Sequence, residues 1–304
     1  MNRLTQIAAA LCMTSGMLAC QPTETSQPAP AKPAATEAST QKVSEFAEKV
    51  PPISVQLWSV KDSVKSDFKG TLSKIAQMGF KGVEFAGEFG PYKNDPQGLK
   101  QFLASLDLKP SGAHVPINQL QGDNYQNTID FLTEVGVNLF IIPIDGRAWD
   151  PEKIDELTTE LTELTQKLSQ EDIYFGYHNH AQEFGDFNDS TFWDYIAQNT
   201  PENMVLQMDV GWVNFAGKDP LHYVKAYPNR TMSTHIKIRS PENNAENVII
   251  GQDNFDWAEL VKTDILYGGT QWLVIEQEEY PEGFTPMQSI EASKAGLEKF
   301  INTL

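Results

Sequence analysis

Cysteine is nearly absent from this sequence: the 304 residues include only Cys12 and Cys20, both within the first twenty positions. The rest of the chain has no pair of thiols to form a disulfide, so a domain folded from it must depend on its apolar core. Roughly 250 residues follow residue 50, and a chain of that length can enclose one large core.

Basic residues are also scarce, because 23 Lys and Arg stand against 41 Asp and Glu, for a formal net charge of −18 at pH 7. An acidic surface repels a nucleic-acid backbone, so the composition argues against nucleic acid as a partner and favours a metal or small-molecule ligand. Arg147 and Arg239 are the only arginines near the ends of the strands predicted below. No basic cluster for a substrate phosphate is evident.

The apolar run near the start, IAAALCMTSGMLA, is too short to cross a bilayer as a mature helix. It follows a short positive start and leads into MLAC, which is typical of a secretory signal with a bacterial lipobox. We therefore predict a lipoprotein signal peptide over residues 1–19, with a lipid on Cys20 that anchors the protein to the periplasmic side of the outer membrane. Gln21 favours the outer membrane, since inner-membrane retention commonly uses an aspartate there. The alternative is an ordinary signal peptide with an incidental cysteine.

Residues 20–50 consist largely of Pro, Ala, Thr, Ser, Gln and Glu. Such a segment buries too little apolar surface to offset the entropy of ordering it, so it is predicted to be a flexible tether. The folded domain is expected over residues 51–304.

Within that domain, short β-rich runs alternate with longer amphipathic segments. The runs are ISVQLWSV, GVEFAG, PSGAHVP, LFIIPID, IYFGYHNH, VLQMDVGW, MSTHIKI and WLVIEQEE. Helices are expected over residues 67–79, 124–136, 151–170, 254–266 and 285–304. No glycine-rich phosphate loop follows the first run, which argues against a doubly wound sheet. The pattern predicts an α/β fold, a single (β/α)8 TIM barrel.

Polar residues gather at the predicted strand ends, where a barrel of this kind carries its catalytic groups. They are Gln56, Glu84, His114, Asp145, His178, His180, Asp209, His235, Lys237, Glu276 and Glu278. A lone histidine there is more often a hydrogen-bonded core residue, and a lone carboxylate more often caps a helix. Several such groups on neighbouring strands are costly to bury unpaired, and a divalent cation is their commonest shared partner.

Six motifs carry a resemblance to a known family: GVEFAG, GAHVP, YHNHAQEF, MDVGWVNFAGKDP, HIKIR and VIEQEEY. In this order, over residues 52–304, the chain resembles the sugar phosphate isomerase/epimerase family, which has a xylose isomerase-like TIM barrel. The resemblance implies one divalent metal ion held by Asp209, His235 and Glu276. His178 takes the place of the glutamate that many relatives carry in an ENH-like motif. Two imidazoles with two carboxylates favour Mn²⁺ or Zn²⁺, while Co²⁺, Fe²⁺ and Mg²⁺ stay open.

The resemblance further implies isomerisation or epimerisation of a ketose or keto-sugar through a metal-stabilised enediolate. Family epimerases use two metal-bound glutamates, and His178 is a poor base once its lone pair is committed to the cation. One-base chemistry is therefore expected, with Glu276, Lys237 and Glu84 as catalytic residues. Lys237 is either a base or a fixed positive charge. The second outcome of such chemistry is β-elimination from a 3-keto-glycoside.

The expected substrate-binding residues are Gln56, Trp58, His114, His180 and Trp212. The aromatic residues among them are alternatively simple packing, and His180 a structural histidine. Whether Asp145 or Glu183 reaches the site stays open, as do the oligomeric state and a non-catalytic sugar-binding lipoprotein. An apurinic endonuclease shares the barrel, but the acidic chain and its export signal oppose that function.

Overall fold

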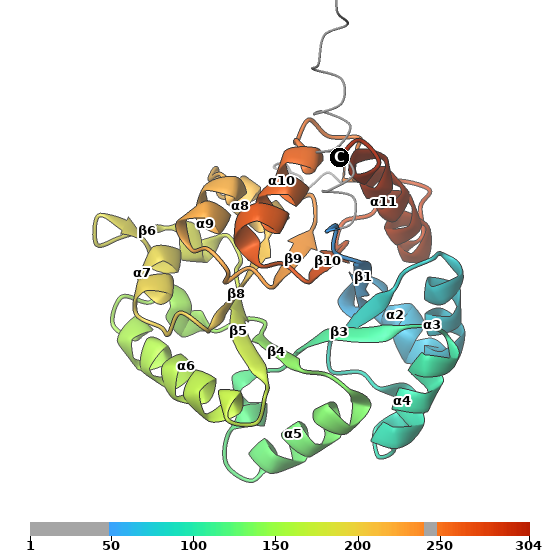
Figure 1. Cartoon of the computed structure of the whole chain (residues 1–304), viewed down its shortest axis with the longest axis horizontal. Helices are drawn as coiled ribbons and strands as arrows, with labels where there is room; N and C mark the ends of the chain where they lie inside the picture. Colours follow the sequence, from blue (N-terminus) through green and yellow to red (C-terminus); the bar gives the residue numbers. More distant parts are fainter. Residues whose placement is uncertain (1–48, 240–247) are drawn as a thin grey trace, which may run out of the picture.

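The computed structural model describes residues 49–239 and 248–304 of the chain (Figure 1). The predicted signal peptide, the lipid attachment at Cys20 and the predicted tether as far as residue 48 lie outside the described residues. Within the two described ranges, no helix combines the length and the apolar character needed to cross a membrane.

Eight parallel strands of the described region close into a central barrel (Figure 1). They are β1 (Ile53–Gln56), β2 (Gly82–Phe85), β3 (Lys109–His114), β4 (Leu139–Ile142), β5 (Tyr174–His178), β8 (Val205–Asp209), β9 (Ser233–Ile236) and β10 (Trp272–Ile275). Each strand pairs with the next in this series, and β10 pairs with β1 to close the ring. The prediction of a single TIM barrel is confirmed.

Helices surround the barrel on its outer face (Figure 1). They are α2 (Lys61–Ser66), α3 (Phe68–Gln77), α4 (Pro96–Ser105), α5 (Asn124–Val135), α6 (Ile154–Ser169), α7 (Phe192–Gln198), α8 (Val210–Phe215), α9 (Pro220–Ala226), α10 (Trp257–Thr263) and α11 (Pro286–Ile301). Short 3-10 turns are η1 (Leu57–Val60), η2 (Gly90–Tyr92), η3 (Ile117–Leu120), η4 (Gly146–Trp149) and η5 (Gln182–Phe184). A π-helical turn, η6 (Asp264–Gly268), extends α10, and β6 (Asp186–Phe187) pairs with β7 (Ser190–Thr191) in a small hairpin.

The helix α6 shows how the segments between strands are held against the barrel. Its buried apolar residues recur every three or four positions, which places them on one face of a helix. They are Ile154, Leu157, Leu161, Leu164 and Leu168. This face packs on β5, so the opposite, Glu- and Thr-rich face is left to solvent.

Two of the predicted runs turn into a helix before they end. The run over 53–60 turns into η1 after Gln56, whose side-chain oxygen accepts a hydrogen bond from the Trp58 N–H at 3.1 Å. The run over 205–212 turns into α8 after Asp209, whose Oδ1 accepts from the Trp212 N–H at 2.9 Å. In both places a polar side chain caps the following turn and so ends the strand.

Two glycines on the barrel strands leave room for a neighbouring side chain and a neighbouring strand. A Cβ atom on Gly82 would lie 2.8 Å from the ring of Trp272, and one on Gly176 would lie 2.2 Å from the carbonyl oxygen of Val205. Alternate residues along each strand point inward. Above these glycines the inward positions are polar, at the carboxyl ends of the strands.

Candidate metal and active site

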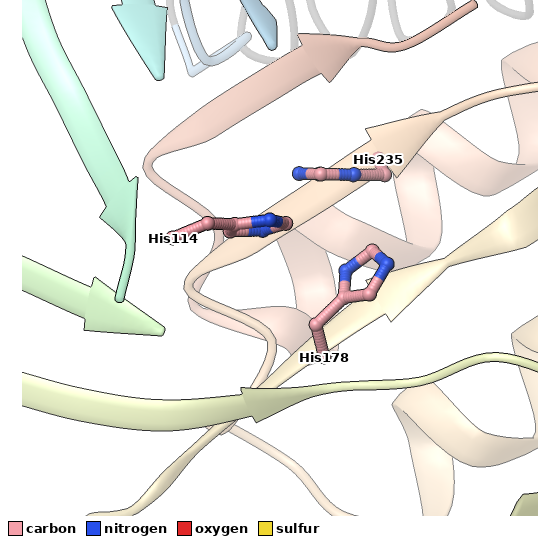
Figure 2. A group of neighbouring side chains, drawn as sticks. All are labelled: His114, His178 and His235. Atoms are coloured by element: carbon pink, nitrogen blue, oxygen red, sulfur yellow. The ribbon is translucent and has the colours of Figure 1, made fainter. Parts of the chain in front are cut away.

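Three imidazole rings converge at the carboxyl ends of β3, β5 and β9. Figure 2 shows His114, His178 and His235 facing one another across the barrel interior. The ring centroids of His178 and His235 are 4.7 Å apart, and the His114 ring stacks on His235 at 5.3 Å. The described part of the chain contains five histidines, and these three lie within one small volume.

The four predicted metal ligands come together in the structure. His178, Asp209, His235 and Glu276 are all buried, and each offers one ligand atom within 4.8 Å of the others. His235 Nδ1 lies 2.9 Å from Glu276 Oε2, and His178 Nε2 lies 3.7 Å from Asp209 Oδ2. This cluster could hold a divalent metal ion.

The donor set fits such an ion. Asp209 Oδ2 is buried without a hydrogen-bond partner in the described residues. The Lys237 ammonium lies 3.2 Å away, but Glu276 and Glu278 share it, so a further cation would offset the cost of burying these carboxylates together. Two imidazole nitrogens and two carboxylate oxygens are ligands that Mn²⁺ and Zn²⁺ both accept. The geometry does not choose between these metals.

The ammonium group of Lys237 lies in the same cluster. Its Nζ lies 3.2 Å from both Asp209 Oδ2 and Glu276 Oε2, and it also forms an ion pair with Glu278. Burial would lower the pKa of Lys237, but the surrounding carboxylates of Asp209, Glu276 and Glu278 raise it above its usual value. Lys237 is therefore a fixed positive charge, the second of its two expected roles.

Charge also decides the protonation of His235 and Glu276. Burial disfavours the charged imidazolium, yet Glu84 and Glu276 raise the pKa of His235 to about 10. Burial would raise the pKa of Glu276, but Lys237 and His235 bring it well below its usual value. Glu276 is therefore an ionised carboxylate between two cationic groups.

Two other histidines of the site are neutral. Burial is the main cause that lowers the pKa of His178 well below its usual value, and nearby imidazolium charge on His235 adds to it. Burial and then Lys237 lower the pKa of His180 to about 4. A neutral imidazole has a lone pair available on one nitrogen, which suits His178 to metal ligation.

Gln56 and Glu84 lie beneath the cluster instead of facing a substrate. Both are fully buried, and Glu84 Oε1 accepts hydrogen bonds from Gln56 Nε2 at 2.7 Å and His235 Nε2 at 2.7 Å. Burial would raise the pKa of Glu84, but the positive charge of His235 lowers it, whereas burial lowers the pKa of His114 and keeps that ring neutral. Its oxygens are taken up by these donors, so its position supports a role in holding His235 rather than the catalytic role expected from the sequence.

A cavity of about 350 Å³ adjoins the cluster. Its charged and polar lining consists of His114, His178, His180, Lys237, Glu276 and Glu278, with Trp58 at its edge. Trp58 is 44% exposed, and the Lys61 ammonium lies 3.8 Å from the centre of its ring. A cavity of this volume accommodates a small molecule such as a monosaccharide.

Trp212 does not line this cavity, in contrast to its predicted substrate-binding role. Its ring lies 5.4 Å from the His180 ring, and the guanidinium of Arg239 sits over it at 4.3 Å. Trp212 therefore packs behind His180, and the packing alternative describes its position better.

The contacts of Asp145 and Glu183 show what each carboxylate does. Buried Glu183 accepts hydrogen bonds from the His180 backbone N–H and the Tyr177 hydroxyl, both at 2.9 Å. Burial raises the pKa of Glu183 to about 7. Asp145 instead pairs with Arg147 at 2.7 Å. Glu183 thus holds the backbone that carries His180, while neither carboxylate lines the cavity.

Gln207 is the residue of this site that the sequence reasoning missed. It is fully buried on β8 and contacts both His114 and His178. The available signal was its place two residues before Asp209 in VLQMD, since alternate strand residues point to the same side. An uncharged amide in an apolar run did not stand out as a functional group.

A polar, histidine-rich cluster at the carboxyl end of a closed barrel lies where TIM-barrel enzymes carry their active sites. The chain belongs to the xylose isomerase-like TIM barrel family, whose model matches residues 72–302.

Curated relatives share part of the sequence. The chain is 22% identical over 263 residues to an inosose dehydratase of Clostridium botulinum (strain Alaska E43 / Type E3), covering 74% of this chain and 86% of that protein. It is 25% identical over 196 residues to an inosose dehydratase of Clostridium perfringens (strain 13 / Type A), covering 57% of this chain and 64% of that protein.

Solved structures share the fold. A sugar phosphate isomerase/epimerase from Parabacteroides distasonis ATCC 8503 superposes with a TM-score of 0.69 at 20% identity, covering 81% of this chain and 94% of that one. An L-ribulose 3-epimerase superposes with a TM-score of 0.60 at 14% identity, covering 83% and 95%. At these identities the likeness shows the barrel and leaves the reaction to the chemistry of the site.

Proposed function

We propose that this chain is a divalent-metal-dependent enzyme that isomerises or epimerises a ketose or keto-sugar by moving the proton next to the carbonyl group. The observation that carries this proposal is the buried cluster of His178, Asp209, His235 and Glu276, with ligand atoms within 4.8 Å of one another. The adjoining cavity, which His178 and Glu276 help to line, supplies the place for a sugar.

The metal would be held by these four side chains. When bound, the ion would supply a Lewis acid that polarises the substrate carbonyl and makes the adjacent C–H more acidic. Mn²⁺ or Zn²⁺ is the expected occupant, since the ligands are two nitrogens and two oxygens.

Side chains of the protein would carry out the proton transfer and bind the substrate. Glu276 is an ionised carboxylate that lines the cavity beside the proposed metal site, so it can accept the proton. Lys237 is charged and lies 3.2 Å from Glu276 Oε2, so it holds that carboxylate and donates a hydrogen bond to a substrate oxygen. The neutral rings of His114 and His180 bind sugar hydroxyl groups, and Trp58 packs against the ring face.

β-Elimination from a keto-sugar, such as cleavage of a 3-keto-glycoside, is the second candidate. It is favoured by the charged Lys237 beside Glu276, because a fixed ammonium can stabilise the negative charge that develops on a departing oxygen. The curated relatives support it too, since their name, inosose dehydratase, denotes the loss of water from a keto-cyclitol.

The predicted lipid on Cys20 would place this enzyme on the periplasmic side of the outer membrane, where free ketoses and glycosides are more accessible than sugar phosphates. Replacing Cys20→Ala and fractionating the cells tests this location. The wild-type protein is expected with the outer membrane and the variant in the soluble fraction. Both proteins in the soluble fraction would contradict the anchor.

One experiment separates the candidate functions. The purified protein is analysed for bound metal, then incubated in D₂O with free ketoses, keto-cyclitols and 3-keto-glycosides while NMR follows exchange at the α-carbon. Bound metal with exchange and a rearranged sugar supports the isomerase or epimerase, whereas exchange with release of water or aglycone supports elimination. A folded protein with neither metal nor exchange would overturn both and leave a non-catalytic sugar-binding lipoprotein.

A further inference from the structure

Gln207 lies at the centre of the buried network beneath the cluster. Its Oε1 is 2.8 Å from His114 Nε2 and 2.9 Å from His178 Nδ1, while its Nε2 is 2.8 Å from Glu84 Oε2 and 2.9 Å from Ser233 Oγ. We infer that Gln207 is a positioning residue that fixes the tautomer of His178, so that His178 Nε2 is the atom presented to a metal ion. This inference rests on the proposed metal site.

The orientation of the amide follows from Glu84. Besides Gln207, the side chains that contact the Glu84 carboxylate present N–H groups to it: Gln56, His114 and His235. An ionised carboxylate only accepts hydrogen bonds, so the Gln207 atom that faces it across 2.8 Å must be the NH₂ group. The reversed amide would place its oxygen against a carboxylate oxygen at that distance.

With its NH₂ group committed to Glu84, the Gln207 oxygen must accept from both imidazoles. A carbonyl oxygen has two lone pairs, which matches the two ring nitrogens within 2.9 Å. His178 Nδ1 therefore carries the proton and His178 Nε2 carries the lone pair. That nitrogen is the one 3.7 Å from Asp209 Oδ2, inside the cluster.

His235 is oriented in the same manner by Glu84. Its Nε2 donates to Glu84 Oε1 at 2.7 Å, which leaves Nδ1 toward Glu276 and Asp209 at 2.9 and 4.0 Å. Metal-bound histidines commonly donate their other N–H to a carboxylate or carbonyl in this manner. Because Gln207 also donates to Glu84, one hydrogen-bonded unit presents both imidazoles to the cluster.

The hydrogen-bond network gives His114 a different role from the proposed ligands His178 and His235. Its Nε2 faces two acceptors, Gln207 Oε1 at 2.8 Å and Glu84 Oε1 at 3.2 Å, so this nitrogen carries a proton. An N–H group cannot ligate a cation. The trio of His114, His178 and His235 in Figure 2 therefore does not bind a metal through this nitrogen of His114, and the four-residue cluster is the better site.

The tautomer itself is measurable without metal or substrate. The protein has five histidines, so ¹⁵N-histidine labelling and long-range ¹H–¹⁵N correlation in the presence of a chelator resolve each ring, with His178 assigned by loss of its signals in His178→Asn. We expect His178 protonated at Nδ1 in the wild type, and shifted toward protonation at Nε2 in Gln207→Met. Protonation of His178 at Nε2 in the wild type, or an unchanged tautomer in Gln207→Met, would overturn the inference.

Metal affinity supplies the second readout. Gln207→Met should bind Mn²⁺ or Zn²⁺ roughly 10- to 100-fold more weakly than the wild type, which is the usual effect of removing a hydrogen-bond partner of a ligating histidine. The matched control is Gln56→Met, which also removes a buried amide donor to Glu84 but does not contact His178. Its loss of affinity should be clearly smaller.

Thermal unfolding followed by circular dichroism shows whether each variant is folded. Equal weakening in the two folded variants would reduce Gln207 to a general structural role and contradict the inference. If the wild type binds no metal, the proposed function fails, and the tautomer measurement still decides the role of Gln207.

Discussion

At the scale of single residues, the charges around Lys237 determine its role. Its buried ammonium lies among Asp209, Glu276 and Glu278, three carboxylates that would otherwise repel one another. An ammonium there acts as a fixed charge, and a bound cation beside it would share the same carboxylates. Its contribution to chemistry should therefore be separable from metal binding.

Lys237→Met should lower kcat by about 10²-fold or more, since it removes a charged donor from the reacting group. Metal affinity should be retained or increased, because the variant deletes a positive charge 3.2 Å from two of the proposed ligands. Metal titration and α-proton exchange, measured on the same preparation, check both effects. Unchanged exchange, or loss of the metal, would contradict this role.

Trp58→Ala should raise KM by roughly tenfold with little effect on kcat or stability, because the role proposed for its ring is to stack on the substrate without supplying a reacting atom. The ring is 44% exposed at the edge of the cavity, so little core packing is lost. Steady-state kinetics give the two constants. The control is Leu266→Ala, an exposed apolar residue at 60% outside the cavity lining, which should leave KM unchanged. Equal KM values in Trp58→Ala and the wild type would show that Trp58 does not contact the substrate.

The sequence was sufficient to predict the four-residue cluster, since strand ends converge in a barrel and the motifs resemble those of a family. It was insufficient for Gln56, Glu84 and Gln207. Such a side chain either reaches the cavity or forms hydrogen bonds with buried groups beneath it. Which of the two occurs depends on the partners that the neighbouring strands place within 3 Å, for example Gln56 Nε2 at 2.7 Å from Glu84 Oε1. A single strand contains no such information.

At the scale of elements, the π-helical turn η6 holds an unusual buried acid. Asp264 is fully buried, and a side-chain hydrogen bond from Thr234 offsets only part of the cost of burying its carboxylate. Burial raises the pKa of Asp264 to about 8. The folded state therefore prefers the protonated acid, and the stability from this group is complete below pH 4 and is lost as the pH rises to about 8.

Asp264→Asn should remove this pH dependence, because the amide stays neutral. The free energy of unfolding of the variant, minus that of the wild type, should increase by at least about 1 kcal/mol between pH 5 and pH 8. Urea unfolding at a series of pH values measures this difference, in which the other titrating groups largely cancel. A difference that stays constant with pH would show that Asp264 is ionised in the folded protein.

Sustained apolar periodicity made most of the longer helices predictable. The predicted segments contain α3, α5, α6 and α11, whose periodicity extends over several turns, and also the shorter α10, whereas α4, with 10 residues, was not predicted. The start of α8 lies in a segment that was predicted as strand. The Asp209 side chain accepts a hydrogen bond from the Trp212 N–H and so ends β8, which the apolar pattern of the run does not indicate. Short helices depend on such local caps more than on periodicity.

Across the whole molecule, the proposed metal ligands come from four strands that are far apart in the sequence but adjacent in the barrel: β5, β8, β9 and β10. The unfolded chain cannot present them together. Metal binding should therefore be coupled to folding, so that the ion stabilises the native barrel by mass action.

At 100 times Kd a bound ion adds about 2.7 kcal/mol, which corresponds to a rise in Tm of roughly 5 °C or more for a domain of this size. The shift should become smaller from pH 8 to pH 6. The carboxylates of Glu84 and Glu276 raise the pKa of His235 to about 10, so binding must release its proton and is disfavoured as protons become more abundant. Thermal unfolding with added Mn²⁺ or Zn²⁺, against a chelator, measures the shift at each pH.

Asp209→Asn separates the site from the acidic surface, because a chain with a net charge of −18 also attracts divalent ions nonspecifically. The substitution removes one proposed ligand and changes the net charge by only one unit. The variant should lose most of the thermal shift if the ion binds within the barrel. An equal shift in both proteins would place the ion on the surface, and no shift in the wild type would argue against a resident metal.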